Sequence, residues 1–320
     1  MINSKFKTQN SKLQLKTQKF LILGCIFAFC ILSFEISYAG KFNKLIYPLK
    51  VTDETGYTIK LPKPPERIIS GIPSVTEMLF ALGAGDRVVG VTENCNFPPA
   101  AKMVEKVGRE SLNLEKIISL KPDLIVMLYD AQRQDIKKLR EFGLPVYAIN
   151  PHSVSDVLYS LSCLGTALNR EHAAYSLIEK MKRKLRWVEA RMKLYKSGRK
   201  RVFVMVGNHP IVAAGRGTFV ADVIRISGGI NIAAKSYGPY PQYNLEKLVE
   251  ENPDVIIIAK NVVRGEEEIY NDSQWQGISA VLNKKVLLID QDIISRPGPR
   301  VIYAIEEIAT FMHNFKEEIW

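Results

Sequence analysis

The chain contains one stretch twice. The first copy, NLEKIISLKPDLIVML, spans residues 113–128, and the second, NLEKLVEENPDVIIIA, spans residues 244–259. In each copy an asparagine at the expected N-cap precedes a short amphipathic helix, a Pro-Asp break and an apolar run. A continuous apolar strand is typical of a parallel sheet that is covered on both faces. Two such units predict two α/β lobes of similar topology.

Residues 1–39 have the features of an export signal rather than of a folded lobe. Five lysines precede an apolar run of about 15 residues, and Ser37 and Ala39 provide the small residues of a signal-peptidase site. The run is shorter than the roughly 20 residues that a spanning helix needs. Cys25 lies inside the run rather than at its end, so a lipoprotein box fits poorly. We therefore expect a periplasmic protein cut after Ala39, with a membrane-anchored form as the alternative.

The remaining chain divides into four predicted parts. They are an edge hairpin (40–65), an N-terminal α/β lobe (66–152), a helical linker (153–198) and a C-terminal α/β lobe (199–320). In the linker, apolar residues recur every three or four positions from Glu171 to Lys196. A helix of that length spans about 39 Å at 1.5 Å per residue. It therefore predicts a rigid strut between the lobes.

Two local patterns make further structural predictions. The S-x-x-E pattern from Ser74 to Glu77 predicts a capping box that opens the first helix of the N-terminal lobe. Cys95 and Cys163 are the only cysteines outside the signal, so one disulfide is conceivable but a disulfide framework is not.

Composition and motifs exclude several classes of function. The formal net charge is +11, but the basic segment 180–201 lacks the aromatic-basic pattern of nucleic-acid binding, so it reads as the solvated face of a helix. The chain has no phosphate-binding loop, H-E-x-x-H or G-x-S-x-G motif, and its four histidines are scattered without metal-ligand spacing. We therefore expect neither an enzyme nor a resident cofactor or metal.

Several segments resemble the periplasmic binding proteins for cobalamin and iron complexes, and the cobalamin-binding members most closely. The N-terminal half contributes RIISGIPSVTEMLFALGAGDRVVGVTENCNFPP and NLEKIISLKPDLIV, and the C-terminal half contributes GRGTFVADVIRISGGINIA, GPYPQYNLEKLVEENPDVIII and IDQDIISRPGPRVIYAIEEI. The resemblance covers about residues 64–312. It implies two similar lobes with mainly parallel sheets, one long connecting helix, and a ligand held between the lobes.

The resemblance also implies a function. Such proteins deliver a bulky metal-containing ligand to an ABC importer in the inner membrane, and we expect cobalamin first, with an iron-siderophore or haem as the alternative. We expect a monomer with no nucleic-acid partner. Two readings from other classes are an exported hydrolase or metal-binding enzyme on an α/β scaffold, and an adaptor with an empty cleft.

Glu115 and Glu246 occupy the first helical turn of each repeat. A carboxylate there interacts favourably with the helix dipole, which is sufficient reason for either residue alone. One carboxylate on each lobe, however, matches an importer whose two similar halves present two similar basic pockets. In the cobalamin-binding relatives the Glu at these positions docks onto the permease, so the resemblance implies the same role here.

The resemblance places the ligand cleft in the loops that follow the strands, at 71–74, 92–98, 129–131, 207–210, 237–243 and 292–297. Asp292 and Arg296 match an acid/base pair that contacts corrin ligands, although a local ion pair is an equal reading. Tyr240 matches a tryptophan that packs on the ligand. The predicted ligand contacts are Asn94, Cys95, Phe97, Tyr129, His209, Tyr240, Asp292 and Arg296.

Three of these predictions carry alternatives. Cys95 reads either as a small packing residue of a cleft loop or as a free thiol. Tyr129 and His209 could ligate haem iron, stack on a chelate or pack in the cleft wall. Asn94, Leu128 and Val206 lie where the best-known cobalamin binder has aromatic residues, which leaves the corrin identity open.

Overall fold

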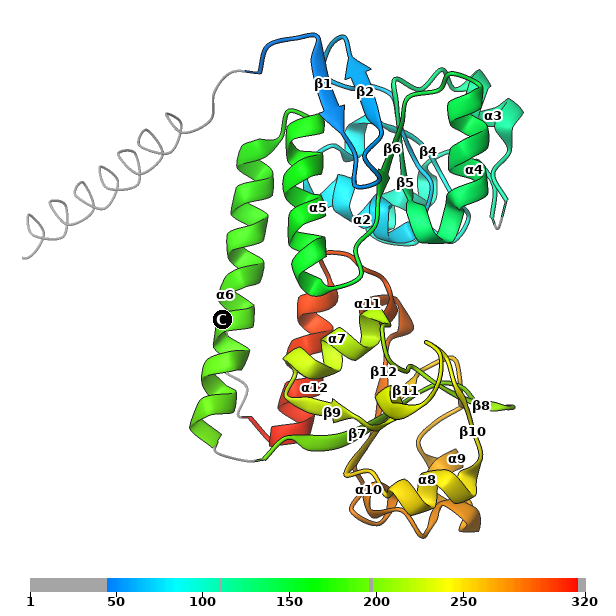
Figure 1. Ribbon diagram of the computed structural model, residues 1–320, viewed down its shortest axis with the longest axis vertical. Coiled ribbons are helices and arrows are strands. Elements are labelled where there is room, and N and C mark those ends of the chain that lie inside the picture. The colour runs from blue at the N-terminus through cyan, green and yellow to red at the C-terminus, as the bar shows by residue number, and fades with distance from the viewer. Residues whose placement is uncertain (1–44, 110, 196–197, 316–320) are drawn as a thin grey trace, which may run out of the picture. The chain divides into compact units, whose positions relative to one another are not determined.

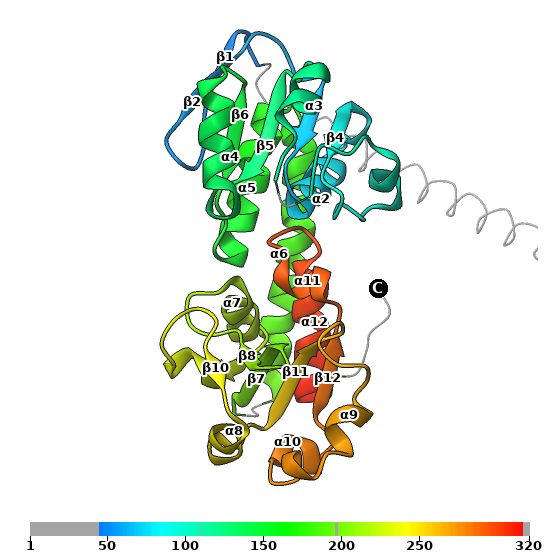
Figure 2. The same cartoon turned by 90° about the vertical axis from the view of Figure 1, so that its right-hand side faces the viewer.

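A computed structural model describes residues 45–109, 111–195 and 198–315 of the chain. From Tyr47 onward the chain forms two α/β lobes that are connected by one long helix, as Figures 1 and 2 show. This confirms the predicted fold class. The export signal expected over residues 1–39 lies outside the described residues.

The N-terminal lobe begins with an antiparallel hairpin of β1 (Leu49–Thr52) and β2 (Thr58–Leu61). Its main sheet is parallel, in the order β4-β3-β5-β6. The four strands are β3 (Ile68–Ser70), β4 (Val88–Val91), β5 (Leu124–Leu128) and β6 (Val146–Ile149). The connecting helices are α2 (Pro73–Ala81), η1 (Gly85–Arg87), η2 (Pro99–Met103), α3 (Leu114–Ser119) and α4 (Tyr129–Glu141).

The C-terminal lobe has a mixed sheet in the order β10-β8-β7-β11-β12, and β9 also pairs with β7. Its strands are β7 (Lys200–Gly207), β8 (Ile211–Ala213), β9 (Gly229–Asn231), β10 (Gln242–Tyr243), β11 (Val255–Ala259) and β12 (Val286–Ile289). β7, β9, β11 and β12 run parallel, whereas β8 and β10 are antiparallel. The helices are α7 (Phe219–Ile226), η3 (Ile232–Lys235), α8 (Leu245–Glu251), α9 (Glu267–Tyr270), η4 (Ser273–Trp275), α10 (Ser279–Leu282), α11 (Gln291–Ser295) and α12 (Val301–His313).

Two successive helices, the second of them the long one, form the segment between the lobes. α5 (Val154–Ala167) begins with a capping box, in which the Ser153 side chain accepts from the Asp156 amide and the Asp156 carboxylate accepts in return. α6 (Glu171–Tyr195) follows and packs against α5 at one end and α12 at the other (Figure 1). α6 is therefore the strut that the helical periodicity predicts.

The central strand of each lobe is buried on both faces, as its apolar sequence predicts. In β5, Leu124 and Val126 join one hydrophobic cluster while Ile125 and Met127 join another. β11 alternates in the same way. Burying both faces accounts for the absence of polar alternation in these two strands.

The predicted capping box at Ser74–Glu77 is wrong. α2 begins one residue earlier, with Pro73 in the first turn and Ile72 as an N-cap that offers no side-chain hydrogen bond. Proline is well suited to this position because its missing N–H would have no helical partner there. Ser74 and Glu77 are both buried, so neither side chain caps the helix from its surface.

Within the described residues, Cys95 and Cys163 are both free. No described helix is long and apolar enough to cross a membrane.

Candidate functional site

The candidate site lies where the carboxyl ends of the strands meet. Parallel strands end at the same edge of a sheet, and ligands of α/β proteins bind outside that edge. In the N-terminal lobe the segments after β3 and β4 leave this edge, and in the C-terminal lobe α11 follows β12 directly. Both views place α11 at the level where the two lobes meet (Figures 1 and 2).

A cavity of about 730 Å³ lies between these segments. From the N-terminal lobe it is lined by Ile72, Pro73, Ser74, Glu93, Asn94, Asn96 and Leu128, and from the C-terminal lobe by Gln291, Asp292, Ser295, Arg296 and Pro297. We call it the interlobe cavity. The described lining residues include no aromatic side chain, and most of them are polar.

A buried carboxylate joins the lobes beneath this cavity. Glu77 of α2 is only 3% exposed, and it accepts hydrogen bonds from two arginines of the other lobe. Arg300 donates from Nε to Oε2 (2.8 Å) and from Nη2 to Oε1 (2.7 Å), a bidentate pair. Arg296 Nη1 donates to Oε1 at 3.0 Å. The hydrogen bond with the Glu77 carboxylate raises the pKa of the Arg300 guanidinium, which therefore stays protonated.

Arg296 also organises the cavity wall. Its Nη1 donates to Asn96 Oδ1 at 2.7 Å, and its Nη2 lies 2.7 Å from Asp292 Oδ1. Asn96 Nδ2 in turn donates to Asp292 Oδ2 at 2.7 Å. The three side chains form a closed ring of hydrogen bonds across the lobe boundary.

The structure brings three of the predicted ligand contacts to this cavity. Asn94, Asp292 and Arg296 all line it. Asp292 and Arg296 form the expected ion pair, so both the ligand-contact and the local-pair readings are compatible with the geometry.

Two further predicted contacts lie elsewhere around the site. Phe97 is 41% exposed and packs under Arg300, whose Cζ lies 4.1 Å from the ring centroid. Tyr240 is 59% exposed and is not among the described residues that line the interlobe cavity.

The Cys95 side chain is buried in the hydrophobic core. Its side chain is 1% exposed, and its Sγ lies 3.0 Å from Thr76 Oγ1 and 3.1 Å from Thr92 Oγ1. The structure fits both readings of Cys95, because the residue is buried in packing and its thiol forms no disulfide. The loop backbone belongs to the cleft, but this side chain points into the core.

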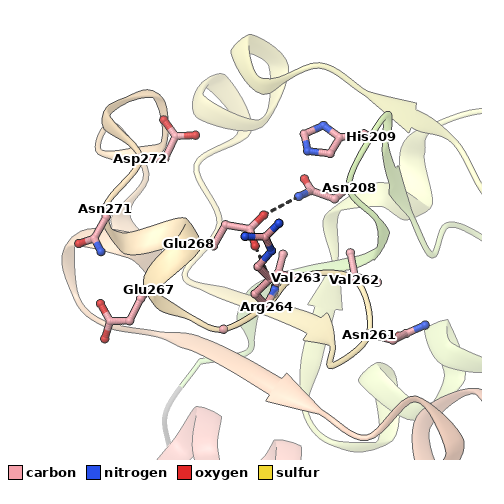
Figure 3. Close-up of a pocket in the computed structure, with 11 residues that line it drawn as sticks. Asn208, His209, Asn261, Val262, Val263, Arg264, Glu267, Glu268, Asn271 and Asp272 are labelled. Carbon is pink, nitrogen blue, oxygen red and sulfur yellow. Dashed lines mark hydrogen bonds between the residues drawn. The ribbon is translucent and has the colours of Figure 1, made fainter.

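Tyr129 and His209 are not among the described residues that line the interlobe cavity, and they lie in different lobes. Tyr129 is half-buried at the start of α4, with Arg133 stacked on its ring at 4.9 Å. His209 lines a different cavity, of about 1100 Å³, which lies wholly within the C-terminal lobe (Figure 3). Asn208 and His209 flank it on one side and α9 on the other, and Glu268 Oε1 accepts from Asn208 Nδ2 at 3.0 Å.

Glu115 and Glu246 occupy equivalent exposed positions. Each is the second residue of its helix, behind an asparagine whose side chain accepts a backbone N–H three residues on. Those hydrogen bonds are Lys116 N to Asn113 Oδ1 (2.9 Å) and Lys247 N to Asn244 Oδ1 (2.8 Å). Neither carboxylate forms an ion pair within the described part of the chain.

Sequence reasoning missed Glu77 as a site residue, and it placed Ser74 and Asn96 in cleft loops without naming them as contacts. For Glu77 a signal was present, because it shares the helix with the buried Val75, Met78 and Leu79. An acid among buried apolar residues needs a partner, since charged groups are almost never fully buried unless paired. Among the described residues, no group of three or more His, Cys, Asp or Glu could hold a metal ion.

Comparison with known proteins gives a consistent result. The model of a family described as "Periplasmic binding protein" matches residues 68–293. The chain is 35% identical over 280 residues to an uncharacterized ABC transporter substrate-binding lipoprotein, YvrC, of Bacillus subtilis, covering 85% of this chain and 88% of the relative. It is 30% identical over 257 residues to the vitamin B12-binding protein of Vibrio cholerae, covering 78% and 90%.

Solved structures of two periplasmic binding proteins are also similar to the structure of this chain. The periplasmic vitamin B12 binding protein BtuF of Vibrio cholerae has a TM-score of 0.69 at 29% identity, covering 78% of this chain and 97% of that chain. The periplasmic heme-binding protein BhuT, in complex with two hemes, has a TM-score of 0.72 at 24% identity, covering 79% and 99%. At that identity the second likeness shows the fold alone.

Proposed function

Because the chain belongs to the family of periplasmic binding proteins, we propose that it is the solute-binding protein of an ABC importer and carries cobalamin. One observation carries the choice of ligand: the similarity to a vitamin B12-binding protein of Vibrio cholerae extends over both lobes. The runner-up ligands are haem and iron-siderophore complexes.

The interlobe cavity supports a large polar ligand. Its lining offers amides, hydroxyls and the Asp292–Arg296 pair, which suit the amide side chains at the edge of a corrin ring. Asn94 and Leu128, which line the cavity, occupy positions where we expect aromatics in a cobalamin binder. Hydrogen bonds would therefore contribute more to affinity here than ring stacking.

The identity of the ligand is tested by measuring which compound stays bound to the purified protein that lacks residues 1–39. The protein is mixed with cyanocobalamin, haem or ferric siderophores, desalted, and the absorbance of the protein fraction is recorded. We expect the corrin spectrum to be retained at a stoichiometry near one. Retention of haem or a siderophore alone would move the assignment to the runner-up, and a colourless fraction in every case would reject a metal-chelate cargo.

We propose further that Glu115 and Glu246 dock onto the permease. The support is geometric: both carboxylates are exposed, each sits in the first turn of the equivalent helix of its lobe, and each follows an identical asparagine cap. Two matching sites on one receptor suit two matching halves of a transporter.

Uptake of labelled ligand in cells that carry the importer tests this docking. Glu115→Gln and Glu246→Gln should each lower uptake about tenfold, since a charge-assisted hydrogen bond is worth about 1.5–3 kcal/mol. Affinity of the purified variants for the ligand should not change. Glu250→Gln, another exposed acid of α8, is the matched control and should transport normally. An equal loss of ligand affinity would contradict a docking role.

Export by residues 1–39 is part of the proposal. We infer cleavage after Ala39, and the mass of the protein recovered from the periplasm tests it. A mass that includes the lysine-rich start would instead support the membrane-anchored form.

A further inference from the structure

The first turn of α2 presents hydrogen-bond donors that nothing in the described chain satisfies. An α-helix leaves its first backbone N–H groups without helical partners, and a side chain at the N-cap ordinarily satisfies one or two of them. Here the N-cap is Ile72, which has no polar side chain. Among the described residues, none accepts a hydrogen bond from the amides of Ser74 and Val75.

The hydroxyl of Ser74 is also without a partner. The residue is 2% exposed, and its Oγ has no hydrogen-bond partner within the described chain. An unsatisfied buried hydroxyl costs about 1–3 kcal/mol. Ser74 nevertheless lines the interlobe cavity, so a molecule in the cavity could supply the missing partner.

The C-terminal lobe contributes an ion-paired guanidinium to the same cavity. Arg296 comes from the other lobe, and Glu77, Asn96 and Asp292 hold its two Nη atoms. Within the described residues its Nε has no acceptor, because every hydrogen bond of this guanidinium is donated by Nη1 or Nη2. Arg296 is therefore rigidly oriented without being closed off from the cavity.

The carboxylates near the cavity do not cancel this arrangement. Glu77 and Asp292 pair with Arg296 and Arg300, so these two carboxylates and two guanidiniums sum to zero net charge. Glu93 lines the cavity but is exposed to solvent, where its charge is screened. The partial positive charge at a helix N-terminus favours an anion, and so do the orphan N–H groups.

We propose that the first turn of α2, with Ser74 and facing Arg296, is a subsite that receives an anionic oxygen of the ligand, a phosphate or a carboxylate. The inference deepens the proposed function and rests on the same cavity. Both leading cargoes carry such a group: the phosphodiester of cobalamin and the propionates of haem. The Ser74 hydroxyl and the two free amides donate to that oxygen, and they leave the ligand no need for an aromatic platform.

Two corrinoids that differ by one phosphate test the subsite. Affinities for cobinamide and cobinamide phosphate are measured by titration calorimetry on the wild type, Ser74→Ala and Ser176→Ala. The wild type should prefer the phosphate form by about tenfold or more, since hydrogen bonds to charged groups contribute at that level. Ser74→Ala should lose most of this preference while its affinity for cobinamide stays unchanged. Ser176→Ala, an exposed serine on α6, should behave as the wild type.

A thermal melt separates the subsite from a structural role. If Ser74 awaits a ligand, removing its unsatisfied hydroxyl should leave the Tm of the empty protein unchanged or raised. A clear fall in Tm, or an equal loss of affinity for both corrinoids, would overturn the proposal. So would a wild type that binds the two corrinoids equally.

If cobalamin is not the ligand, a second pair of compounds still tests the subsite. If neither corrinoid binds, the same variants are titrated with haem and with haem dimethyl ester, whose propionates carry no charge. Loss of the haem preference in Ser74→Ala would sustain the subsite while rejecting cobalamin. Failure to bind any of the four compounds, or a haem preference that Ser74→Ala retains, would overturn the subsite as well.

Discussion

The two lobes share an inner framework that the repeat alone does not reveal. In the N-terminal lobe, Arg67 donates from its side chain to the carbonyl of Leu120 at the end of α3 (2.7 Å from Nη2). In the C-terminal lobe, Arg201 donates to the carbonyl of Glu251 at the end of α8. In both, the aspartate of the Pro-Asp break accepts the backbone N–H of that arginine. The helix and strand of each repeat are thus joined in the same way to the first strand of the main sheet of their lobe, β3 or β7.

The two lobes differ in the acidic side chains with which each contacts the rest of the molecule. The helix after the first strand of the N-terminal lobe, α2, sends Glu77 across to two arginines. Its counterpart in the C-terminal lobe, α7, carries Asp222. The Oδ2 of Asp222 accepts a hydrogen bond from the backbone N–H of Val154, the first residue of α5, at 2.9 Å. The framework that builds each core is therefore repeated, whereas the groups that hold the lobes together and line the cavity are not.

The largest expected effect comes from removing Glu77, the carboxylate that joins the two lobes. Glu77→Ala leaves two partly buried guanidiniums without their shared carboxylate, and breaking such a pair typically costs about 3–5 kcal/mol. We expect a fall of at least about 3 kcal/mol in the free energy of unfolding by urea. Asp222→Ala, which removes an acid from the counterpart helix, should cost about 1 kcal/mol. Equal costs for the two would contradict the asymmetry.

A smaller difference is expected inside the shared framework. Asp123 accepts two backbone N–H groups, from Glu66 and Arg67 at 2.8 Å each, whereas Asp254 accepts one, from Arg201 at 2.7 Å. At about 1 kcal/mol for each hydrogen bond, Asp123→Ala should destabilise by about 2 kcal/mol and Asp254→Ala by about 1 kcal/mol. The same urea titration measures both. A larger loss for Asp254→Ala would show that the two frameworks are not equivalent.

The lobes should also respond oppositely to pH. Burial lowers the pKa of His313 in the C-terminal lobe, so its contribution to stability is present above about pH 6.5 and is lost as the pH falls. Burial raises the pKa of Glu54 in the N-terminal hairpin, so its contribution is present at low pH and is lost as the pH rises above about 4.3.

Urea midpoints from pH 4 to pH 8 measure this contrast. His313→Gln should flatten the decline below pH 6.5, and Glu54→Gln should flatten the decline on the alkaline side of pH 4.3. Unchanged profiles in both variants would remove these two groups as the cause.

The smallest expected effect concerns ligand charge. Glu93 is an exposed carboxylate that lines the interlobe cavity. Glu93→Gln should raise the affinity for an anionic ligand about two- to threefold, because an exposed charge interaction is worth less than about 1 kcal/mol. Affinity for cobinamide should not rise. Titration calorimetry at low salt makes the comparison, and a larger gain for cobinamide than for cobinamide phosphate would contradict it.

The fold could be predicted because its signals are local. Asn113 and Asn244 cap their helices as expected, and the strands after them are buried on both faces. Caps, breaks and apolar runs are each decided within a few residues of the chain. The same holds for Ser153 and the long helix that follows.

The site was less predictable because its contacts are long-range. The partners of Glu77 lie 219 and 223 residues further along the chain, so a local pattern could only suggest a capping box. The neighbours of Cys95 in its loop, Asn94 and Asn96, line the cavity, but no sequence signal decides which side chain of a loop faces the core. Asp292 and Arg296 were found through the resemblance rather than through any pattern in the residues themselves.

The continuous helix α6 has a consequence for the kinetics of ligand exchange. It packs along both lobes, and 25 residues at 1.5 Å make a rod about 37 Å long that has no internal hinge. The lobes could separate widely only if the packing contacts between this helix and one of the lobes were broken. Ligand entry and release should therefore proceed by rearranging the loops and side chains at the cavity mouth. The radius of gyration of the empty and the loaded protein should then be nearly the same, and the dissociation rate should depend on local contacts such as the Asn96–Asp292 hydrogen bond rather than on a swinging domain.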